Sequence, residues 1–565
     1  NSETAIITIS GVSGGGASEN GTQSQTIAIT DKALNSGSQF TYNASTATAL
    51  ESSDVEFTNS GHDDTKSYGG GTLTSAGGHD PYKTINLHKA LAYTNSGTPM
   101  RGSGEVIAIL DTGFQVNGLG SNSSTHQEFN GTTITVNDTS EFLTYNGTGS
   151  STFYHGTFVA SIAAGNYGTG AVMGVAPEAS LHLHSYAGTG GLKFLPTWWA
   201  TGTADAEADG AVVQNNSWGY SDDTKNGSTA TSTISDLVTY QSNNSTTAAA
   251  TLVAYQSIDT DGDGTNDVIN SSTVANWNTY IDALDSFQDT GVIVFALSNQ
   301  EYHADADIAA GLPEIATNLQ EAWINVANID VTGTGAPADN GYELRSAPCG
   351  STAEYCLGAD GWNILGAGGN EHSVGGYDYS VSIGTSYAAP QVSGAVALLA
   401  THFPNHSPEQ LADRLLASAY NNWAAFGADG TTTFGNGVEH GYSTDYGHGV
   451  MDIYAALQPI VSDSVGRSVY TQSNSNSNSP SQSQSIDRSY MVASRSFGDA
   501  IQNALSGQVN YFYDALAGGF AYKMESHLAP QSKTKSLMNV EAEVNTLTRA
   551  STLNNQININ KNSYQ

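Results

Sequence analysis

Short apolar segments alternate with helical patterns through the middle of the chain. Four of these segments are nearly continuous runs of apolar residues, at 105–110, 211–216, 291–297 and 322–329. Strands that are buried on both faces have this pattern, whereas a strand with one solvated face alternates apolar and polar residues. Because helical runs separate the segments, the sequence predicts an α/β domain over residues 81–460, with a parallel sheet covered by helices on both faces.

The regions on either side of this domain differ from it in composition. Residues 1–80 are rich in Gly, Ser, Thr and Asn and predict an irregular or β-rich extension. Residues 461–485 include TQSNSNSNSPSQSQS, which is typical of a flexible linker. In the C-terminal segment, 486–565, SFGDAIQNAL predicts a helix and YFYDALAGGFAYKM fits either a helix or a strand. The polar tail from about Ala529 is expected to be loosely ordered.

Charge narrows the range of partners. Asp and Glu number 53 against 17 Lys and Arg, so the formal net charge is −36. Such a surface repels phosphate, and we therefore expect no nucleic-acid partner. It suits a secreted protein, a salty habitat or the binding of divalent cations. No apolar run approaches the roughly 18 residues of a membrane-spanning helix.

Three polar residues stand out at the predicted ends of strands or starts of helices. Asp111 directly follows the apolar run VIAIL, and His155 begins HGTFVASIAAG. Ser386 precedes YAAPQVSGAVALLATHF, which predicts a buried helix with Pro390 in its first turn. Each has an ordinary interpretation when taken alone. Asp111 would start a loop or cap a helix, His155 would begin a buried helix, and Ser386 would be a helix N-cap.

Together the three residues indicate one site. An open α/β sheet forms its ligand crevice at the carboxyl ends of its strands, and Asp, His, Ser is a known order of catalytic triads. The motifs DTG, HGTFVASIAAG and GTSYAAPQVSGAVALL closely resemble the three active-site motifs of the subtilisin-like serine peptidases, the subtilases. The resemblance covers roughly residues 82–459 and implies a subtilisin-like fold. It also implies that Ser386 is the nucleophile, His155 its base and Asp111 the residue that orients the imidazole.

The same resemblance extends to the groups around the reacting carbonyl. In GVIVFALSNQ, Asn299 matches the side-chain donor of the oxyanion hole, although many subtilases have Ala-Gly-Asn where this chain has Leu-Ser-Asn. A loop asparagine after a strand is the alternative. The segment NNSWGY resembles the one that pairs with an extended peptide substrate, and its alternative is a plain strand-to-loop turn. Its best matches are Ser217, Trp218 and Gly219.

An insertion near 220–290 contains the acidic sequence DTDGDGTNDVIN, at 259–270. Its spacing fits a calcium loop of the EF-hand type, except that Asn270 stands where a bidentate Glu is usual. A solvated acidic turn is the alternative, but clustered carboxylates repel one another unless a hard cation neutralises them. We expect one structural Ca²⁺ bound by Asp259, Asp261, Asp263, Thr265, Asp267 and Asn270.

The chain has two cysteines, Cys349 and Cys356. Their spacing is too wide for a CxxC redox pair, and two thiols alone make a poor zinc site. Because other features indicate an extracellular protein, we expect a local disulfide, which would contribute about 2 kcal/mol on the chain-entropy model. Two reduced core cysteines are the alternative.

These observations predict a secreted serine endopeptidase acting on proteins and peptides, outside the cell or on a bacterial cell surface. The alternative is a non-catalytic, calcium-dependent surface or adhesion protein on a subtilase scaffold. The acid-acting Ser-Glu-Asp relatives fit less well because they lack the histidine of the HGT motif. CGSTAEYCLGADG and SFGDAIQNAL…YFYDALAGGF also resemble segments of bacterial autotransporter-type subtilases. In these proteins the peptidase precedes an outer-membrane barrel, so anchoring through a barrel outside this chain is a further expectation. The sequence does not predict an oligomeric state.

The calcium loop leads to a first prediction. If Ca²⁺ orders residues 259–270, excess EGTA will lower the melting temperature of the protein, because the ion stabilises only the folded state. Thermal unfolding with and without the chelator measures this effect. An unchanged melting curve in EGTA would contradict the prediction.

Overall fold

The computed structural model describes most of the predicted α/β domain and shorter stretches of both ends. The described residues are 2–9, 23–30, 40–54, 56–57, 66–68, 71–73, 80–117, 124–136, 155–168, 172–185, 187–188, 191–192, 195–219, 233–255, 273–331, 342–374, 377–460, 491–493, 509–523 and 528–530. The chain forms two compact units, Asn1–Gln472 with Tyr513–Phe520, and Ser473–Phe512 with Ala521–Gln565. The boundaries predicted at 80, 460 and 485 stay predictions.

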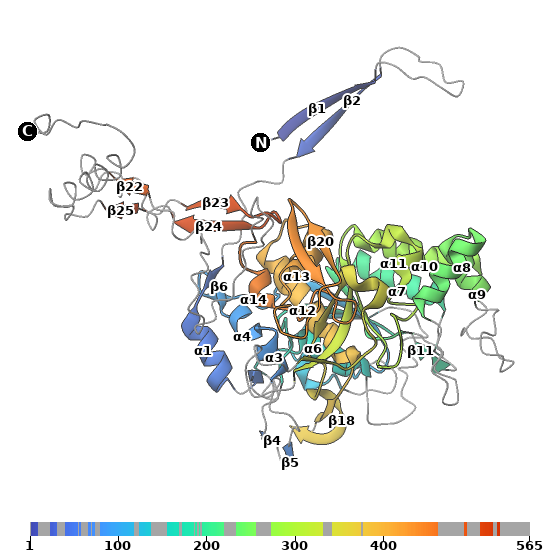
Figure 1. Ribbon diagram of the computed structural model, residues 1–565. Helices are drawn as coiled ribbons and strands as arrows, with labels where there is room; N and C mark the ends of the chain where they lie inside the picture. The colour runs from blue at the N-terminus through green and yellow to red at the C-terminus, as the bar shows by residue number, and fades with distance from the viewer. Residues whose placement is uncertain are drawn as a thin grey trace, which may run out of the picture. The chain divides into compact units, whose positions relative to one another are not determined.

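A sheet of eight described strands forms the centre of the first unit (Figure 1). In spatial order these are β16 (Tyr342–Leu344), β15 (Trp323–Val331), β14 (Val292–Ala296), β13 (Val213–Asn216), β8 (Val106–Asp111), β10 (Ser180–Ser185) and β9 (Ile134–Val136), with β17 (Cys356–Ala359) also paired to β15. All these pairs are parallel except β15 with β16. The predicted parallel sheet is therefore confirmed, with one antiparallel strand that the apolar pattern did not indicate.

The order of the strands reverses beside β8. Strand β10 pairs with one edge of β8, and the chain then crosses to the opposite edge, where β13 pairs with it. Strands β14 and β15 follow on that second side. This reversal is a topological switch point, and open α/β sheets bind ligands at the carboxyl ends of the strands at such a point.

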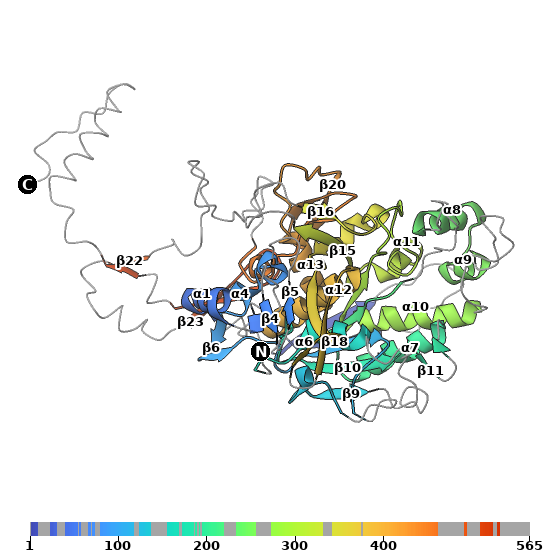
Figure 2. The same ribbon diagram turned by 90° about the horizontal axis from the view of Figure 1, so that it is seen from below.

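Helices pack against both faces of the sheet. Two of them, α6 (His155–Ala164) and α12 (Thr385–His402), contact each other and the central strands, whereas α7 (Pro196–Ala208) and α10 (Val274–Gln288) form a second pair. Helix α9 (Ala248–Tyr255) packs against α10, and α8 (Ile234–Asn244) packs against α9 (Figure 1, Figure 2). The other described α-helices of this region are α3 (Pro81–Thr84), α4 (Leu87–Ala90), α11 (Leu312–Ile315), α13 (Pro408–Ala417) and α14 (Ile453–Ala456).

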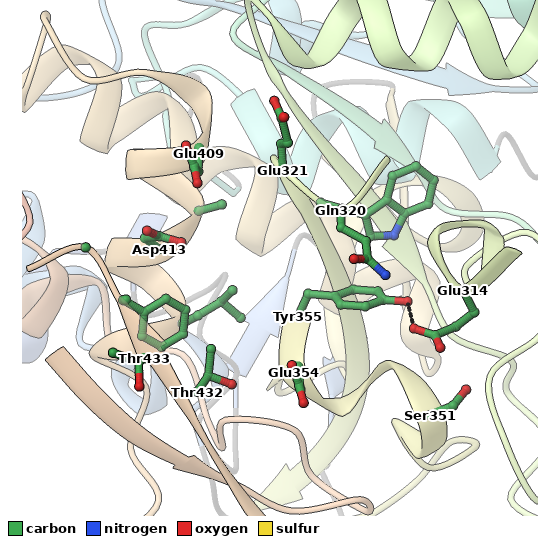
Figure 3. A pocket seen from close by; sticks show the side chains of 15 residues that line it. Glu314, Gln320, Glu321, Ser351, Glu354, Tyr355, Glu409, Asp413, Thr432 and Thr433 are labelled. Carbon is green, nitrogen blue, oxygen red and sulfur yellow. Dashed lines mark hydrogen bonds between the residues drawn. The ribbon is translucent and has the colours of Figure 1, made fainter. Parts of the chain in front are cut away.

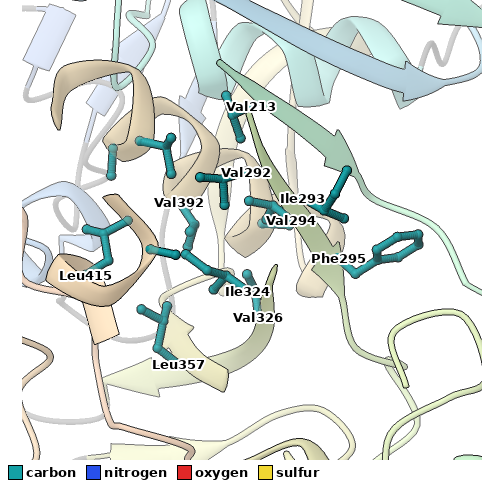
Figure 4. Close-up of a cluster of buried hydrophobic side chains, with 14 of the residues drawn as sticks. Val213, Val292, Ile293, Val294, Phe295, Ile324, Val326, Leu357, Val392 and Leu415 are labelled. Carbon is teal, nitrogen blue, oxygen red and sulfur yellow. The ribbon is translucent and has the colours of Figure 1, made fainter. Parts of the chain in front are cut away.

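The main core lies between the sheet and α12 (Figure 4). In β14, Val292, Ile293, Val294 and Phe295 are all fully buried, because successive side chains enter the two opposite layers of helices. Figure 4 shows Val392 of α12 close to the valines of this strand. The continuous apolar runs of the sequence are thus the strands that are covered on both faces.

The described residues also form several small sheets. The hairpins pair β1 (Ser2–Ile9) with β2 (Gln23–Thr30), β4 (Lys66–Tyr68) with β5 (Gly71–Leu73), β11 (Ala187–Gly188) with β12 (Gly191–Leu192), β18 (Ile364–Val374) with β19 (Tyr377–Ser382), β20 (Gly430–Phe434) with β21 (Val438–Tyr442), and β23 (Val509–Tyr513) with β24 (Gly519–Lys523). Strands β3 (Thr41–Tyr42), β6 (Tyr93–Asn95) and β7 (Thr98–Pro99) form a sheet, and β22 (Met491–Ala493) pairs with β25 (Leu528–Pro530).

These elements decide two of the sequence expectations. The described part of the N-terminal extension contains strands as expected, but also helix α1 (Ala44–Ser53), which the composition did not predict. Its N-cap is Asn43, whose side chain accepts hydrogen bonds from two main-chain amides of the first turn. YFYDALAGGFAYKM forms strands rather than a helix. The predicted helix SFGDAIQNAL and the predicted linker lie outside the described residues. Among the described helices, none combines the length and the apolar character needed to cross a bilayer.

A buried ion pair fixes the turn between β23 and β24 to helix α13. The guanidinium Nη1 of Arg414, in α13, donates to the carboxylate of Asp514 at 2.8 Å, and both side chains are fully buried. Arg414 also donates to the carbonyls of Ala456 and Gln458, while Asp514 accepts the amide of Ile460. The pair therefore joins three segments that are far apart in the sequence.

Breaking this pair is expected to destabilise the fold. Arg414→Met leaves the carboxylate of Asp514 buried without its counter-ion, which typically costs about 3–5 kcal/mol of unfolding free energy. Glu178→Gln is the matched control, because Glu178 pairs with Arg101 at 3.6 Å and is 36% exposed, so its loss should cost less than about 1 kcal/mol. Urea unfolding measures both variants. Equal losses in the two would contradict the prediction.

Candidate active site

Asp111 and His155 form a hydrogen-bonded pair at the switch point. Asp111 is the last residue of β8 and is fully buried, and His155 is the first residue of α6. The imidazole Nδ1 lies 2.8 Å from Asp111 Oδ1 and 3.0 Å from Oδ2. A carboxylate can only accept hydrogen bonds, so Nδ1 carries the proton and Nε2 of the neutral ring keeps its lone pair. Asp111 also accepts a hydrogen bond from the amide of Thr112, as expected for a residue that starts a loop. It therefore starts the loop and orients the imidazole at the same time.

Ser386 lies in the first turn of α12, beside this pair. The ring of the next residue, Tyr387, is 5.8 Å from the imidazole of His155, so the starts of α6 and α12 are adjacent. Ser386 is the second residue of the helix, whereas Gly384 is the N-cap and makes no side-chain capping bond. The N-cap interpretation of Ser386 was therefore wrong. Its amide is one of the first-turn N–H groups that have no partner within a helix.

Pro390 explains how Ser386 is held. The sequence predicted that this proline lies in the first turn of the helix. Because α12 begins at Thr385, Pro390 lies one turn further along. There it lacks the N–H that would bond the carbonyl of Ser386. The hydroxyl of Ser217 donates to that carbonyl instead, at 2.9 Å, and Ser386 Oγ donates to the carbonyl of Ser217 at 3.2 Å. The two serines thus exchange hydrogen bonds between the end of β13 and the start of α12.

Asn299 is oriented by the same helix start. Its Oδ1 accepts from the amide of Thr385 at 2.8 Å and from the Thr385 hydroxyl at 3.0 Å. Gly384 has φ of 150°, and a Cβ there would lie 2.9 Å from Asn299 Oδ1, so glycine is required for this approach. Because Oδ1 is occupied, the carboxamide presents its Nδ2 donor on the other side.

A cavity of about 160 Å³ brings the remaining predicted residues together. Ser386, Asn299, Ser217, Trp218 and Gly219 all line it. The indole of Trp218 packs on Trp199 at a centroid distance of 4.7 Å and on Phe295 at 5.3 Å, so this wall is firmly supported. The predicted nucleophile, oxyanion donor and substrate segment therefore share one small crevice.

The His155–Asp111 pair sets the protonation of the imidazole. Burial lowers the pKa of His155, but the negative charge of Asp111 and its hydrogen bond raise the pKa more, and the balance lies above the ordinary value of 6.5. The carboxylate thus stabilises the imidazolium form. This arrangement lets Nε2 take a proton from a neighbouring hydroxyl and hold it.

The sequence did not identify the polar network behind the crevice. Ser393 of α12 donates to Asn215 Oδ1 at 3.0 Å, and Asn215 Nδ2 donates to Ser217 Oγ at 2.9 Å. All three side chains are buried, and the network continues to the carbonyl of Ser386. The one signal in the sequence was the polar pair Asn215–Asn216 at the end of an otherwise apolar strand.

Two other predicted sites have different outcomes. Cys349 and Cys356 form a disulfide and are both buried, so they are not a reduced pair. The predicted calcium loop, 259–270, lies outside the described residues and remains a prediction.

A larger cavity, of about 430 Å³, contains none of the predicted site residues (Figure 3). Tyr355 donates to Glu314 there at 2.7 Å, and burial next to Glu409 raises the pKa of Asp413 to about 7. Its other acidic lining residues are Glu321 and Glu354. Because neither Asp111, His155 nor Ser386 lines it, this cavity is not the candidate active site.

A doubly wound sheet with Asp, His and Ser around its crevice is typical of the subtilisin-like class of serine peptidases. The model of the subtilase family matches residues 102–449, and the chain belongs to that family. It is similar to an extracellular serine protease of Serratia marcescens, with 25% identity over 332 residues, which are 55% of this chain and 29% of that protein. It is also similar to fervidolysin of Fervidobacterium pennivorans, with 30% identity over 184 residues, which are 31% of this chain and 23% of that protein.

The chain thus spans less than a third of the length of either relative. The crystal structure of fervidolysin, described as a keratinolytic enzyme related to subtilisin, matches with a TM-score of 0.42 and 22% identity. That match covers 67% of this chain and 48% of fervidolysin.

The pKa of His155 gives a prediction that does not depend on activity. In the wild type, His155 should titrate above pH 6.5, and in Asp111→Asn it should titrate below pH 6.5, because only the effect of burial remains. NMR titration of the imidazole signals measures both values, with His155→Gln identifying the resonance. Asp209→Asn is the matched control, since it removes the carboxylate 2.7 Å from His182 and should leave the His155 value unchanged. A His155 pKa that stays above 6.5 in Asp111→Asn would overturn the assignment.

Proposed function

We propose that the protein is a serine endopeptidase that hydrolyses peptide bonds through Asp111, His155 and Ser386. The observation that carries this proposal is the His155–Asp111 hydrogen bond of 2.8 Å at the switch point, next to the helix start that contains Ser386. Membership of the subtilase family and similarity to an extracellular serine protease support it.

In the proposed reaction, Ser386 Oγ leaves its hydrogen bond to Ser217 and attacks the carbonyl carbon of the substrate. His155 Nε2 takes the hydroxyl proton, and Asp111 stabilises the resulting imidazolium. Collapse of the tetrahedral intermediate breaks the C–N bond as His155 returns the proton to the leaving amine. Water then hydrolyses the acyl-enzyme by the same steps, with His155 again acting as base.

The negative oxygen of the tetrahedral intermediate needs donors that are already in position. We assign this role to Nδ2 of Asn299 and the main-chain amide of Ser386. The hydrogen bonds from Thr385 to Asn299 Oδ1 support the assignment, because they fix the carboxamide before the substrate arrives. Fixed donors of this kind typically contribute a factor of about 100 to 1000 in rate.

The proposal also covers how the substrate is held, where the protein acts and which metal ion it binds. Ser217, Trp218 and Gly219 would pair with the main chain of an extended peptide, which recognises peptides of many sequences. The high acidic charge and the disulfide support secretion. Structural Ca²⁺ at 259–270 is proposed from the acidic spacing of that loop alone.

A fluorophosphonate probe tests the proposed nucleophile. It should label the wild type and leave Ser386→Ala unlabelled, because the probe bonds only to an activated serine hydroxyl. Ser382→Ala is the control, since it removes a nearby hydroxyl in β19 and should be labelled like the wild type. The wild type and Ser382→Ala should also cleave a denatured substrate protein, and Ser386→Ala should not. Absence of labelling in the folded wild type would favour the non-catalytic surface protein.

A further inference from the structure

A line of three buried polar side chains links the middle of α12 to its own start. Ser393 Oγ donates to Asn215 Oδ1 at 3.0 Å, and Asn215 Nδ2 donates to Ser217 Oγ at 2.9 Å. The Ser217 hydroxyl then donates to the main-chain carbonyl of Ser386, also at 2.9 Å. We refer to Ser393, Asn215 and Ser217 together as the polar bridge.

The inner part of the polar bridge does not reach the crevice. Ser217 lines the 160 Å³ cavity together with Ser386, whereas Ser393 and Asn215 do not line it and are fully buried. The two inner residues therefore have no surface on which to bind a substrate. Since buried polar groups are costly unless they are hydrogen-bonded, we looked for the effect of the bridge at its outer end, where it meets the proposed nucleophile.

The polar bridge has a direction, because each hydroxyl has a single hydrogen to donate. Asn215 Nδ2 occupies a lone pair of Ser217 Oγ, so the hydroxyl hydrogen of Ser217 is left for the carbonyl of Ser386. A reversed bridge would also satisfy its inner members. Ser217 would donate to Asn215 and Asn215 to Ser393, whose Oγ lies 3.3 Å from the carbonyl of Ala389 and could donate to it.

Pro390 decides between these two directions. Its missing N–H leaves the carbonyl of Ser386 without the usual helical donor. In a reversed bridge that carbonyl would lose the Ser217 hydroxyl as well, and a carbonyl without a donor in a part-buried position is unfavourable. The described direction is therefore the stable one. Ser393 reinforces it, because its hydroxyl holds Oδ1 of Asn215 and so turns the amide nitrogen toward Ser217.

We propose that Ser217 is a positioning residue for the reaction, acting through its hydroxyl, and that Asn215 and Ser393 fix the direction in which this hydroxyl donates. The inference rests on the proposed endopeptidase function. Ser217 and Ser386 exchange two hydrogen bonds, and only the one donated by Ser386 Oγ breaks when Oγ attacks. The bond donated by Ser217 persists, so the main chain of Ser386 keeps its place while its side chain reacts.

This role differs from the pairing of the segment 217–219 with a peptide. Pairing uses the main chain, which alanine at position 217 would still offer, whereas positioning uses the hydroxyl. Loss of the hydroxyl should therefore lower kcat and leave KM nearly unchanged. The substrate would be bound as before, but the attacking oxygen and the proposed oxyanion amide of Ser386 would be misplaced. A residue that only stabilises the fold would not divide its effect in this way.

Kinetics with a chromogenic peptide amide test the proposal in three variants. Ser217→Ala should lower kcat by about 10- to 100-fold, as expected when reacting groups are slightly misplaced, with KM nearly unchanged. Ser393→Ala should lower kcat in the same way by a smaller factor, although Ser393 does not line the crevice. Ser161→Ala is the matched control and should keep kcat. Ser161 is 1% exposed and also has two hydrogen bonds, to the carbonyl of Phe158 and from the amide of Ala367.

The carbonyl carbon of Ser386 gives a readout that needs no turnover. Labelling serine with ¹³C at the carbonyl and tyrosine with ¹⁵N selects Ser–Tyr peptide bonds in NMR spectra, among them Ser386–Tyr387, whose signal disappears in Ser386→Ala. A carbonyl carbon moves upfield when it loses a hydrogen bond. The Ser386 signal should therefore move upfield in Ser217→Ala and in Ser393→Ala and stay in place in Ser161→Ala.

Three results would overturn the proposal and leave the endopeptidase function intact: an unchanged carbonyl signal in Ser217→Ala, an unchanged kcat in that variant, or an equal fall of kcat in Ser161→Ala. If Ser217→Ala does not fold, Ser393→Ala decides by the same criteria, because it leaves Ser217 in place. A wild type that cleaves no peptide would refute the endopeptidase function, and with it the role of Ser217 in the reaction, whatever the carbonyl signal does.

Discussion

The missing amide of Pro390 is the constraint around which the crevice is arranged. It leaves the carbonyl of Ser386 without a helical partner, and the hydroxyl of Ser217 takes that position. Since Ser386 Oγ returns a hydrogen bond to the carbonyl of Ser217, strand β13 and helix α12 are joined at the point where both end or begin. The helix itself is buried against the sheet, so the position of Ser386 follows from the packing of the core rather than from a flexible loop.

The same helix start organises the groups on either side of it. Thr385 holds the carboxamide of Asn299 through two hydrogen bonds, and Tyr387 packs beside the imidazole of His155. Three successive residues of α12 therefore fix the proposed oxyanion donor, the proposed nucleophile and the environment of the proposed base. A site built on the end of a regular helix is more precise than one built on loops alone, which suits a reaction that needs groups aligned within a fraction of an ångström.

Much of the fold could be predicted because its central strands are buried on both faces. The continuous apolar runs at 291–297 and 322–329 leave few other interpretations, and the triad residues occur where such runs or helical patterns begin or end. The surroundings of Asp307 could not be predicted, since it lies in an irregular loop and Gly219, which comes close to its carboxylate, follows a different strand. From the sequence alone, YFYDALAGGFAYKM fits either a helix or a strand, because aromatic side chains can pack in both.

Asp111 and Asp307 are two buried carboxylates with different surroundings. Asp111 is fully buried and lies against an imidazole, so its charge is used to raise the pKa of His155. Asp307 accepts hydrogen bonds from the main-chain amides of Ala309 and Ala310, so its carboxylate orders the loop that follows Asn299. The first carboxylate thus acts on an ionisable side chain, and the second acts on the main chain.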